Sequence, residues 1–192
     1  MTTIVIAEDE AIIRLDLREL LEEEGYQVVG EAGRGDQAVE LVRSLRPDLV
    51  ILDVKMPGMD GIEAARHITA DGVCAVLMLT AFSQREVVEQ ARDAGAVAYL
   101  VKPFQKSDLV PAIELAIARY AETKALIAEV GELTERLEVR KVIDRAKGRL
   151  IDAHGMKESE AFAFIQKSAM SQRTTMRAVA ESVLKGETAP TA

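Results

Sequence analysis

The chain has 192 residues, of which 48% are apolar and 29% charged, as in ordinary globular proteins of one large or two small domains. No run of about 18 apolar residues occurs, which excludes a membrane-spanning segment. The N-terminus has no basic segment followed by an apolar core, so we expect a cytoplasmic protein rather than a secreted one. The single cysteine, Cys74, excludes an internal disulfide and a cysteine-ligated zinc site.

The formal net charge of −8 is spread unevenly along the chain. Residues 1–120 hold 12 Lys and Arg against 21 Asp and Glu, a balance of −9, whereas residues 121–192 hold 12 against 11, a balance of +1. Within 136–177 the count is 10 basic against 5 acidic residues. The acidic average of the whole chain therefore does not exclude a nucleic-acid partner for the C-terminal part.

The first 120 residues alternate short apolar runs with amphipathic stretches. Apolar residues at helical spacing predict helices, and the β-branched runs between them predict strands. The expected strands cover residues 4–7, 27–32, 49–52, 75–79 and 98–101, and the expected helices cover 11–24, 36–45, 61–70, 85–94 and 107–120. Because the strands are short and apolar on both faces, the pattern predicts an α/β fold, (βα)5, whose doubly wound parallel sheet is covered by helices.

Chemically active residues stand at the ends of four of these strands. Glu8 and Asp9 follow the first strand, Asp53 the third, Thr80 the fourth and Lys102 the fifth. The carboxyl ends of parallel strands lie on one edge of the sheet. The carboxylates would therefore crowd together and repel one another unless a cation joins them. Oxygen ligands of this kind favour Mg²⁺.

Such a site can accept a phosphoryl group. Asp53, central in the sheet, is the best placed nucleophile, and Glu8 and Asp9 would hold the metal. Lys102 would neutralise charge on the phosphoryl oxygens, and Thr80 would donate a hydrogen bond to one of them. A single Asp at a strand end is often only a turn residue, but the joint occurrence at four strand ends favours a site.

These residues and their surroundings resemble the receiver domain of two-component response regulators. The resemblance rests on Glu8-Asp9 after IVIA, on DVKMPGMDG at 53–61, on Thr80-Ala81 and on YLVKP at 99–103, and it covers about residues 1–120. It implies a flavodoxin-like fold with strand order 2-1-3-4-5, phosphorylation by a sensor histidine kinase, and a frequent cis peptide bond before Pro103.

The resemblance also implies a role for each site residue. Asp53 would be the phosphoacceptor, and Thr80 and Lys102 would contact the phosphoryl group. Tyr99 would turn inward when Thr80 moves. The implied Mg²⁺ ligands are Glu8, Asp9, Asp53 and the main-chain carbonyl of Lys55.

Beyond residue 120 the pattern is helical only. Leu126, Val130, Leu133 and Leu137 follow heptad spacing over two heptads. Residues 121–137 are therefore expected to form a linker helix. Two interpretations stay open: a short coiled coil that joins two copies of the chain, or a helix packed on its own domain.

Residues 138–186 are expected to form a small all-α module of three helices, followed by a flexible tail at 187–192. Apolar residues at helical spacing begin with Val139 and Ile143, continue with Ala161, Phe162 and Ile165, and end with a stretch that Thr174 or Thr175 can cap. Basic residues decorate the first helix. A bare run of charge is usually only a solvated face, although phosphate backbones need such donors.

The order of residues in this module resembles the ANTAR domain, a three-helix RNA-binding antitermination module. The resemblance spans roughly 126–185 and rests on Ala146-Lys147-Gly148, Gly155, Glu160-Ala161-Phe162, Ala169 and Val179-Ala180. It implies binding to RNA hairpins, whose unstacked loop bases suit short basic helical surfaces. The candidate RNA-binding residues are Arg140, Lys141, Lys147, Gly148 and Arg173.

One departure from the family concerns the start of the second helix. Lys157 occupies the place of the usual Ser or Thr, so the capping box with Glu160 is broken, and we expect a frayed helix start unless Ser159 substitutes. Phe162 and Phe164 are both candidates for burial, with Phe164 the one further off the main apolar face.

The sequence therefore predicts a response regulator that is phosphorylated on Asp53, dimerises on phosphorylation and acts as a transcription antiterminator. We expect no enzymatic activity beyond assistance to its own aspartyl phosphorylation and dephosphorylation. The alternative is a phosphorelay adaptor whose C-terminal helices mediate dimerisation without nucleic acid. A DNA-binding helix-turn-helix is weaker, because the third helix offers only Arg173, Arg177 and Lys185 to a groove.

Overall fold

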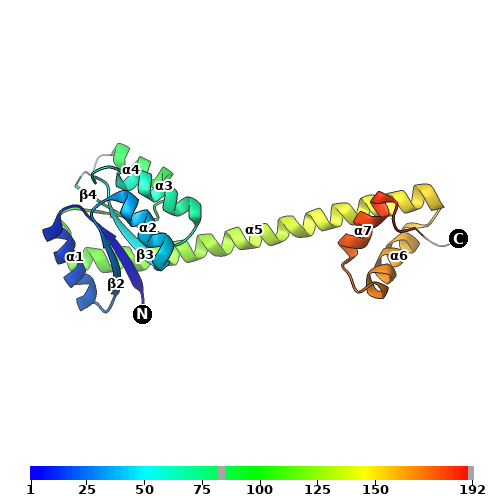
Figure 1. The fold of residues 1–192 in the computed structure, drawn as a ribbon, viewed down its shortest axis with the longest axis horizontal. Helices are drawn as coiled ribbons and strands as arrows, with labels where there is room; N and C mark the ends of the chain where they lie inside the picture. Colours follow the sequence, from blue (N-terminus) through cyan, green and yellow to red (C-terminus); the bar gives the residue numbers. More distant parts are fainter. Residues whose placement is uncertain (82–84, 190–192) are drawn as a thin grey trace. The chain divides into compact units, whose positions relative to one another are not determined.

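The computed structural model describes residues 1–81 and 85–189. The chain divides into two compact units, residues 1–124 and 125–192. Helix α5 (Lys106–His154) contributes residues to both (Figure 1). Among the described residues, no helix combines the length and the apolar content that crossing a membrane requires.

The N-terminal unit is built on a five-stranded parallel sheet. Its strands are β1 (Thr3–Ala7), β2 (Gln27–Ala32), β3 (Leu49–Asp53), β4 (Ala75–Thr80) and β5 (Ala98–Val101), in the order β2-β1-β3-β4-β5. The sequence-based prediction of a doubly wound sheet in this order is confirmed. Strand β3 lies at the centre, with all five of its residues buried, which places Asp53 in the middle of the carboxyl edge.

Helices cover both faces of the sheet, so each strand divides its side chains between two cores. Along β1, Ile4 and Ile6 point into a core shared with α1 (Ala11–Glu23) and α5. Val5 and Ala7 point into the opposite core, because successive side chains of a strand alternate between faces. The helices of that second core are α2 (Gly35–Leu45), α3 (Gly61–Asp71) and α4 (Arg85–Asp93).

Two of the apolar residues expected on helical faces are not in the core. Ile12 of α1 is 77% exposed, whereas Leu17 and Leu21 of the same helix are fully buried. Leu45 at the end of α2 is also exposed. Ile12 lies five residues before Leu17, which puts it on a different side of a helix with 3.6 residues per turn.

Helix α5 replaces the separate helices that the sequence predicted at 107–120, 121–137 and from 138 onward. At its start Asp108 accepts a hydrogen bond from the Gln105 amide at 3.0 Å, which caps the first turn. Two tyrosines secure its first part to the sheet unit. The Tyr26 hydroxyl donates to Glu114 at 3.0 Å, and the Tyr120 hydroxyl donates to the carbonyl of Gly72 at 2.6 Å.

The C-terminal unit packs the last part of α5 against α6 (Glu158–Ser171) and α7 (Met176–Lys185). Its core holds eight buried side chains: Ala146, Leu150, Ala161, Ile165, Ala169, Val179, Ala180 and Val183.

The prediction for the two phenylalanines of α6 is wrong in part. Phe164 is half-buried against this core, whereas Phe162 is 43% exposed. The buried face of α6 runs through Ala161, Ile165 and Ala169. Phe164 stands at one border of this face and Phe162 at the other, so the helical period alone does not decide which ring is buried.

The start of α6 also differs from the expectation of a frayed end. The helix begins at Glu158 with Lys157 as its N-cap, and Ser159 does not substitute. A Lys side chain cannot accept a hydrogen bond, so half of the capping box is absent. The other half forms, because the Glu160 carboxylate accepts from the Lys157 amide at 2.8 Å, and this bond is enough to define the first turn.

Candidate functional site

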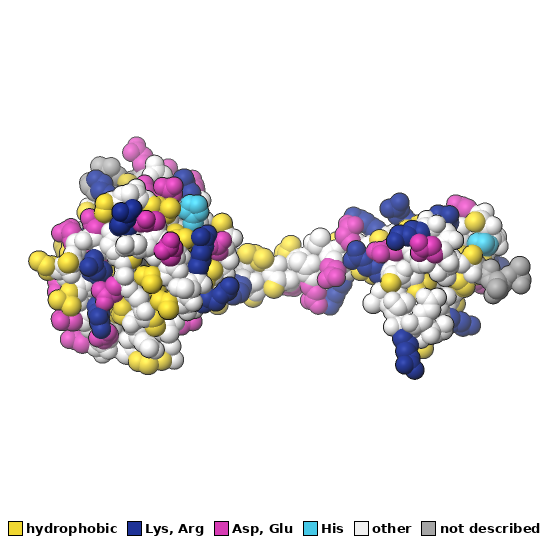
Figure 2. Space-filling model, viewed as in Figure 1, with side chains coloured by type: hydrophobic (Ala, Val, Ile, Leu, Met, Phe, Trp, Pro, Cys, Tyr) yellow, Lys and Arg dark blue, Asp and Glu magenta, His cyan; other side chains and the backbone are white. Residues whose placement is uncertain are grey.

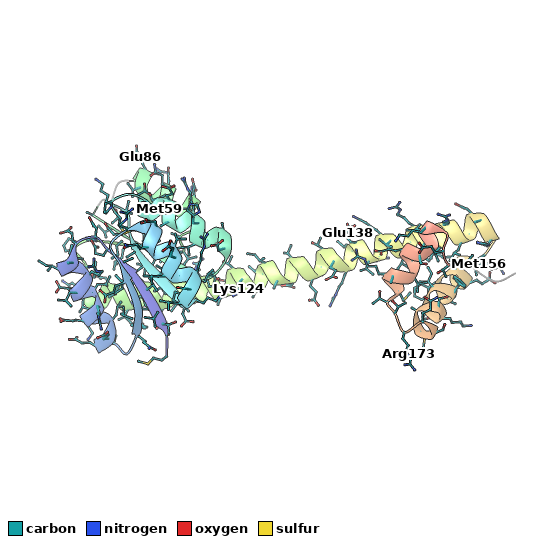
Figure 3. The ribbon with its side chains drawn as sticks, viewed as in Figure 1. Met59, Glu86, Lys124, Glu138, Met156 and Arg173 are labelled. Atoms are coloured by element: carbon teal, nitrogen blue, oxygen red, sulfur yellow. The ribbon has the colours of Figure 1, made fainter. Side chains whose placement is uncertain are left out.

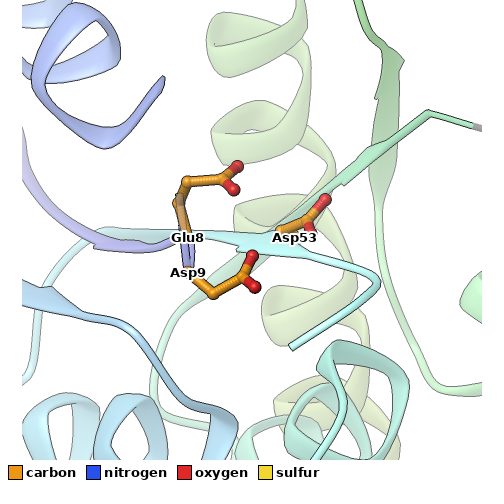
Figure 4. Close-up of side chains that lie close together, drawn as sticks. All are labelled: Glu8, Asp9 and Asp53. Carbon is orange, nitrogen blue, oxygen red and sulfur yellow. The ribbon is translucent and has the colours of Figure 1, made fainter. Parts of the chain in front are cut away.

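Three carboxylates meet at the carboxyl edge of the central strands. Glu8 and Asp9 follow β1, and Asp53 ends β3. One ligand oxygen from each can be chosen so that all lie within 4.8 Å of one another, and the three side chains point toward a common space (Figure 4). Three oxygen donors at this separation match the ligand set of a hard divalent cation such as Mg²⁺.

Lys102, which follows β5, brings a positive charge into the site. Its Nζ lies 2.5 Å from Oε2 of Glu8 and 2.9 Å from Oδ1 of Asp53. Burial alone would lower the pKa of Lys102, but its hydrogen bonds to the two carboxylates outweigh burial and raise the pKa. Lys102 is therefore charged at neutral pH and neutralises part of the carboxylate charge.

Glu8 is the least accessible member of the site, with no exposed surface. Burial raises the pKa of its carboxyl group, an effect that the hydrogen bond from Lys102 opposes. Its backbone is also fixed, because Nη1 of Arg14 donates to the Glu8 carbonyl at 2.5 Å. Arg14 in turn lies 3.4 Å from Oε2 of Glu31, so an ion pair supports the turn that carries Glu8 and Asp9.

The site opens into a cavity of about 200 Å³. Asp9, Asp53, Lys55 and Lys102 are among its lining residues. Lys55 is exposed on the loop after β3. The cavity brings the proposed nucleophile, a proposed metal ligand and the ammonium group of Lys102 to one solvent-connected space, which is the geometry that a phosphoryl group needs in order to reach Asp53.

The two proposed switch residues stand on neighbouring strands. Thr80 ends β4 and is 2% exposed, whereas Tyr99 on β5 is 50% exposed. Thr80 pairs with Val101 in the sheet, and its carbonyl accepts from the Lys102 amide at 2.8 Å. This backbone bond links Thr80 to Lys102. The peptide bond between Lys102 and Pro103 is cis, as the family resemblance implied.

Gly61 is a residue of the site whose role the sequence did not indicate. A Cβ atom at Gly61 would lie 1.9 Å from the carbonyl oxygen of Asp53, well inside the contact distance of two heavy atoms. The Gly61 amide donates to the carbonyl of Val54 at 3.0 Å, and Asp60 caps the helix that follows. The only signal in the sequence is the Gly at the end of the 53–61 block.

The candidate RNA-binding residues lie in the C-terminal unit, and most are engaged with carboxylates. Nζ of Lys147 lies 2.8 Å from both Asp144 and Glu158, and its side chain is only 16% exposed. Lys141 pairs with Glu138 at 2.7 Å, and Arg140 lies 4.0 Å from Asp144. Lys147 therefore joins α5 to α6 and is poorly available to a ligand.

Gly148 and Arg173 differ from the rest of that set. Gly148 is half-buried within α5, and a Cβ there would meet nothing within 4 Å. Arg173 has a positive φ of 51° in the turn between α6 and α7, and its side chain projects away from both helices (Figure 3).

Several exposed Lys and Arg side chains of this unit make no ion pair among the described residues. Arg149 is one of them, but its guanidinium donates to the carbonyl of Leu184. The others are Arg145, Lys157, Lys167, Arg173 and Lys185.

The fold and the site together define a receiver unit, and comparison with known families agrees. The family of response regulator receiver domains matches residues 4–114, and the ANTAR domain family matches residues 131–184. The chain belongs to the two-component response regulators that join a receiver domain to an ANTAR domain.

One relative matches nearly the whole chain. The transcriptional regulatory protein PdtaR of Mycobacterium tuberculosis is 60% identical over 182 residues, which cover 95% of this chain and 89% of the relative.

Among solved structures, a LuxR-family response regulator from Aurantimonas is 38% identical, with a TM-score of 0.58 over 62% of this chain and 86% of that one. A CheX–CheY complex from Borrelia burgdorferi that contains BeF₃ and Mg²⁺ aligns with a TM-score of 0.56 and 26% identity, over 58% of this chain and 86% of that one.

The contact at Gly61 yields a prediction. Replacing Gly61 with Ala pushes the main chain of Asp53 out of place, so we expect phosphorylation of Asp53 to slow at least about tenfold and the receiver to lose about 1–3 kcal/mol of stability. The measurements are phosphorylation rate and urea unfolding. Gly131→Ala is the matched control, because a Cβ there meets nothing within 4 Å. Equal phosphorylation rates for the two variants would contradict the prediction.

Proposed function

We propose that a sensor histidine kinase phosphorylates Asp53 and that the C-terminal unit then binds RNA hairpins as a transcription antiterminator. The observation that carries the first half is the position of Asp53, which is 6% exposed, touches Lys102 and faces the cavity. A partly shielded carboxylate next to a fixed ammonium group is suited to direct attack on phosphorus.

In the reaction, a carboxylate oxygen of Asp53 attacks the phosphorus of a phosphohistidine. The P–O bond forms as the P–N bond breaks, and the histidine of the kinase leaves with the electron pair. Lys102 turns from Glu8 toward the phosphoryl oxygens and neutralises their charge. We propose that the chain acts on no separate substrate and assists only its own phosphorylation and dephosphorylation.

The acidic residues fit a divalent cation. Glu8, Asp9 and Asp53, with the main-chain carbonyl of Lys55, would hold Mg²⁺, which supplies positive charge opposite the phosphoryl oxygens. The carboxylates lie close enough to share one ion, and the Borrelia burgdorferi complex contains both Mg²⁺ and BeF₃.

We propose that Thr80 and Tyr99 carry the signal away from the site. Thr80 is buried one strand from Asp53, and its hydroxyl would move toward a phosphoryl oxygen. Tyr99 is half-exposed beside a groove lined by residues of α4. Its ring would turn inward as Thr80 moves, which changes the surface formed by α4, β5 and α5.

The first test is phosphotransfer. Asp53→Asn removes the nucleophilic oxygen while it keeps the shape of the side chain, so we expect no acid-stable, base-labile phosphate on the variant after incubation with a phosphorylated histidine kinase and Mg²⁺. Asp60→Asn is the control, because Asp60 caps α3 and Asn can cap it equally well. Stoichiometric aspartyl phosphate on Asp53→Asn, detected by mass spectrometry, would refute the assignment.

The RNA half of the proposal is supported by the ANTAR match and by the exposed basic side chains of the C-terminal unit (Figure 2). Among them, Arg145 and Arg173 have no ion pair in the described part of the chain, so their charges are available to phosphates. Lys147 is less suited to a test, because it pairs with two carboxylates and its loss would disturb the contact between α5 and α6.

We expect the double variant Arg145→Glu/Arg173→Glu to bind hairpin RNA at least about tenfold more weakly, with the slope of log affinity against log salt reduced by about 1 for each lost phosphate contact. Arg119→Glu is the control, since Arg119 is also exposed on α5 but belongs to the receiver unit. Fluorescence anisotropy at several salt concentrations measures both quantities, and an unchanged slope would contradict the proposed surface.

We also propose that phosphorylation favours a dimer through α5. Large apolar side chains stand exposed on the stretch between Lys124 and Glu138, which Figure 3 labels: Leu126, Ile127, Val130, Leu133 and Leu137, each at least 50% exposed. Four of them follow the heptad spacing of a two-stranded coiled coil. The same feature supports the rival function, an adaptor that dimerises without nucleic acid.

The dimer prediction is tested by charge in the heptad positions. Leu133→Glu places a carboxylate in the proposed seam, so we expect the phosphorylated variant to sediment as a monomer where the unchanged protein sediments as a dimer. Ala128→Glu, on the outer side of the same stretch, should dimerise normally. If the protein without substitutions dimerises on phosphorylation but binds no hairpin RNA, the result favours the adaptor function.

A further inference from the structure

Phe162 is a large aromatic side chain that the C-terminal unit leaves in solvent. The chain has only four Phe and no Trp. Phe162 is 43% exposed on α6, whereas Ala161 and Ile165 of the same helix are fully buried. The ring therefore stands at the rim of the core, with one part anchored and another part open. Single exposed apolar residues are common, so the role of Phe162 has to be judged from the residues around it.

The surroundings of Phe162 follow from the contact between α5 and α6. Glu158 and Phe162 are four residues apart and share one face of α6. Lys147 reaches Glu158 from α5 at 2.8 Å, and Asp144 lies beside Lys147 at 2.8 Å. Phe162 therefore lies one helical turn after Glu158, a residue of α6 that meets Lys147 of α5.

Pairing among the charged residues around Lys147 leaves one cation, Arg140, with only a weak partner. Asp144 and Glu158 both pair with Lys147. Arg140 is on the same face of α5, four residues before Asp144, and its side chain is 81% exposed with a separation of 4.0 Å from Asp144. Its guanidinium group is thus only weakly engaged and can reach an anion.

We propose that Phe162 is a stacking platform for an unpaired base of the RNA, with Arg140 binding a neighbouring phosphate. This proposal rests on the proposed RNA-binding function. The stacking contact is one that an RNA loop can make and a duplex cannot. Unstacked loop bases pack on aromatic rings, whereas bases inside a duplex are already stacked. An exposed aromatic ring on α6 and an exposed guanidinium on α5, in a segment with 10 basic and 5 acidic residues, suit RNA, which offers both bases and phosphates. An acidic partner would use only the charge, and an apolar partner only the ring.

The lysine between Asp144 and Glu158 has a defined part in this arrangement. Lys147 ties α5 to α6, so the two helices that carry Arg140 and Phe162 are held together before RNA binds. Holding the two helices together in advance avoids the entropic cost of ordering them on binding. Lys147 is thus a positioning residue, and Phe162 and Arg140 are the residues that touch the ligand.

The absence of tryptophan from the sequence provides a direct test. Phe162→Trp keeps an aromatic ring and introduces a single tryptophan at the proposed contact. The probe is an RNA hairpin that the full-length protein selects from a pool of hairpins with one constant stem and randomised loops. The comparison is a duplex with the sequence of the constant stem. We expect the hairpin to quench the indole fluorescence of this variant and the duplex to leave it unchanged. Met170→Trp is the control on the same helix, because Met170 is 75% exposed.

Affinity measurements complete the test. Phe162→Leu keeps an apolar side chain at the rim of the core but removes the aromatic face, so hairpin affinity should fall about tenfold to a hundredfold, with the helical content by circular dichroism unchanged. Phe162→Tyr should restore the affinity. Full hairpin affinity in Phe162→Leu, or equal quenching in the Met170→Trp control, would overturn the proposal and leave the RNA-binding function intact.

Two further outcomes distinguish a failure of this proposal from a failure of the proposed RNA-binding function. If the unchanged protein enriches no hairpin from the pool, the proposed RNA-binding function fails and this contact fails with it. If Phe162→Leu lowers self-association in sedimentation but not hairpin affinity, the ring serves a contact between copies of the chain, which also overturns the proposal.

Discussion

The ammonium group of Lys102 lies between the carboxylates of Glu8 and Asp53, and the receiver unit depends on this contact. Glu8 is fully buried, and a buried carboxylate close to a second one is unfavourable without a cation. The sheet supplies that cation. The register of β4 with β5 and the bond from the Lys102 amide to the Thr80 carbonyl fix the backbone position of Lys102. Strand pairing thus determines the electrostatics of the site.

The same contact leaves the site with an excess of negative charge. Three carboxylates share a space whose charge Lys102 only partly neutralises, so a divalent cation and a phosphoryl group together would bring the local charge closer to balance. Lys102 would then exchange one partner for another rather than give up its charge. The backbone around the site is fixed independently, by Arg14 at the Glu8 carbonyl and by the close approach of Gly61 to Asp53.

The sequence predicted the sheet and the gathering of Glu8, Asp9, Asp53 and Lys102 because both follow from simple rules. Short strands buried on both faces form parallel sheets, and the ends of parallel strands share one edge. It did not predict the role of Gly61. That role depends on how closely the backbone of Gly61 approaches the backbone of Asp53, which the spacing of apolar residues does not encode. It also could not show that Lys147 is engaged with Glu158, eleven residues away on another helix.

The two phenylalanines of α6 illustrate a finer limit. Phe162 and Phe164 both fit an apolar helical pattern, and the sequence favoured the wrong one for burial. Which ring enters the core depends on how α6 is rotated against α5 and α7, and the small buried residues Ala161 and Ala169 allow more than one rotation. Sequence periodicity gives the period of an apolar face but only an approximate direction for it.

Those small residues have a further consequence. Half of the eight side chains in the C-terminal core are alanines, so the helices approach closely while little apolar surface leaves the solvent. A unit with so small a core has a low free energy of unfolding, and a ligand that binds only its folded form raises that free energy. Heating should therefore melt the chain in two transitions, the C-terminal unit first, and a bound ligand of that unit would shift only the earlier one.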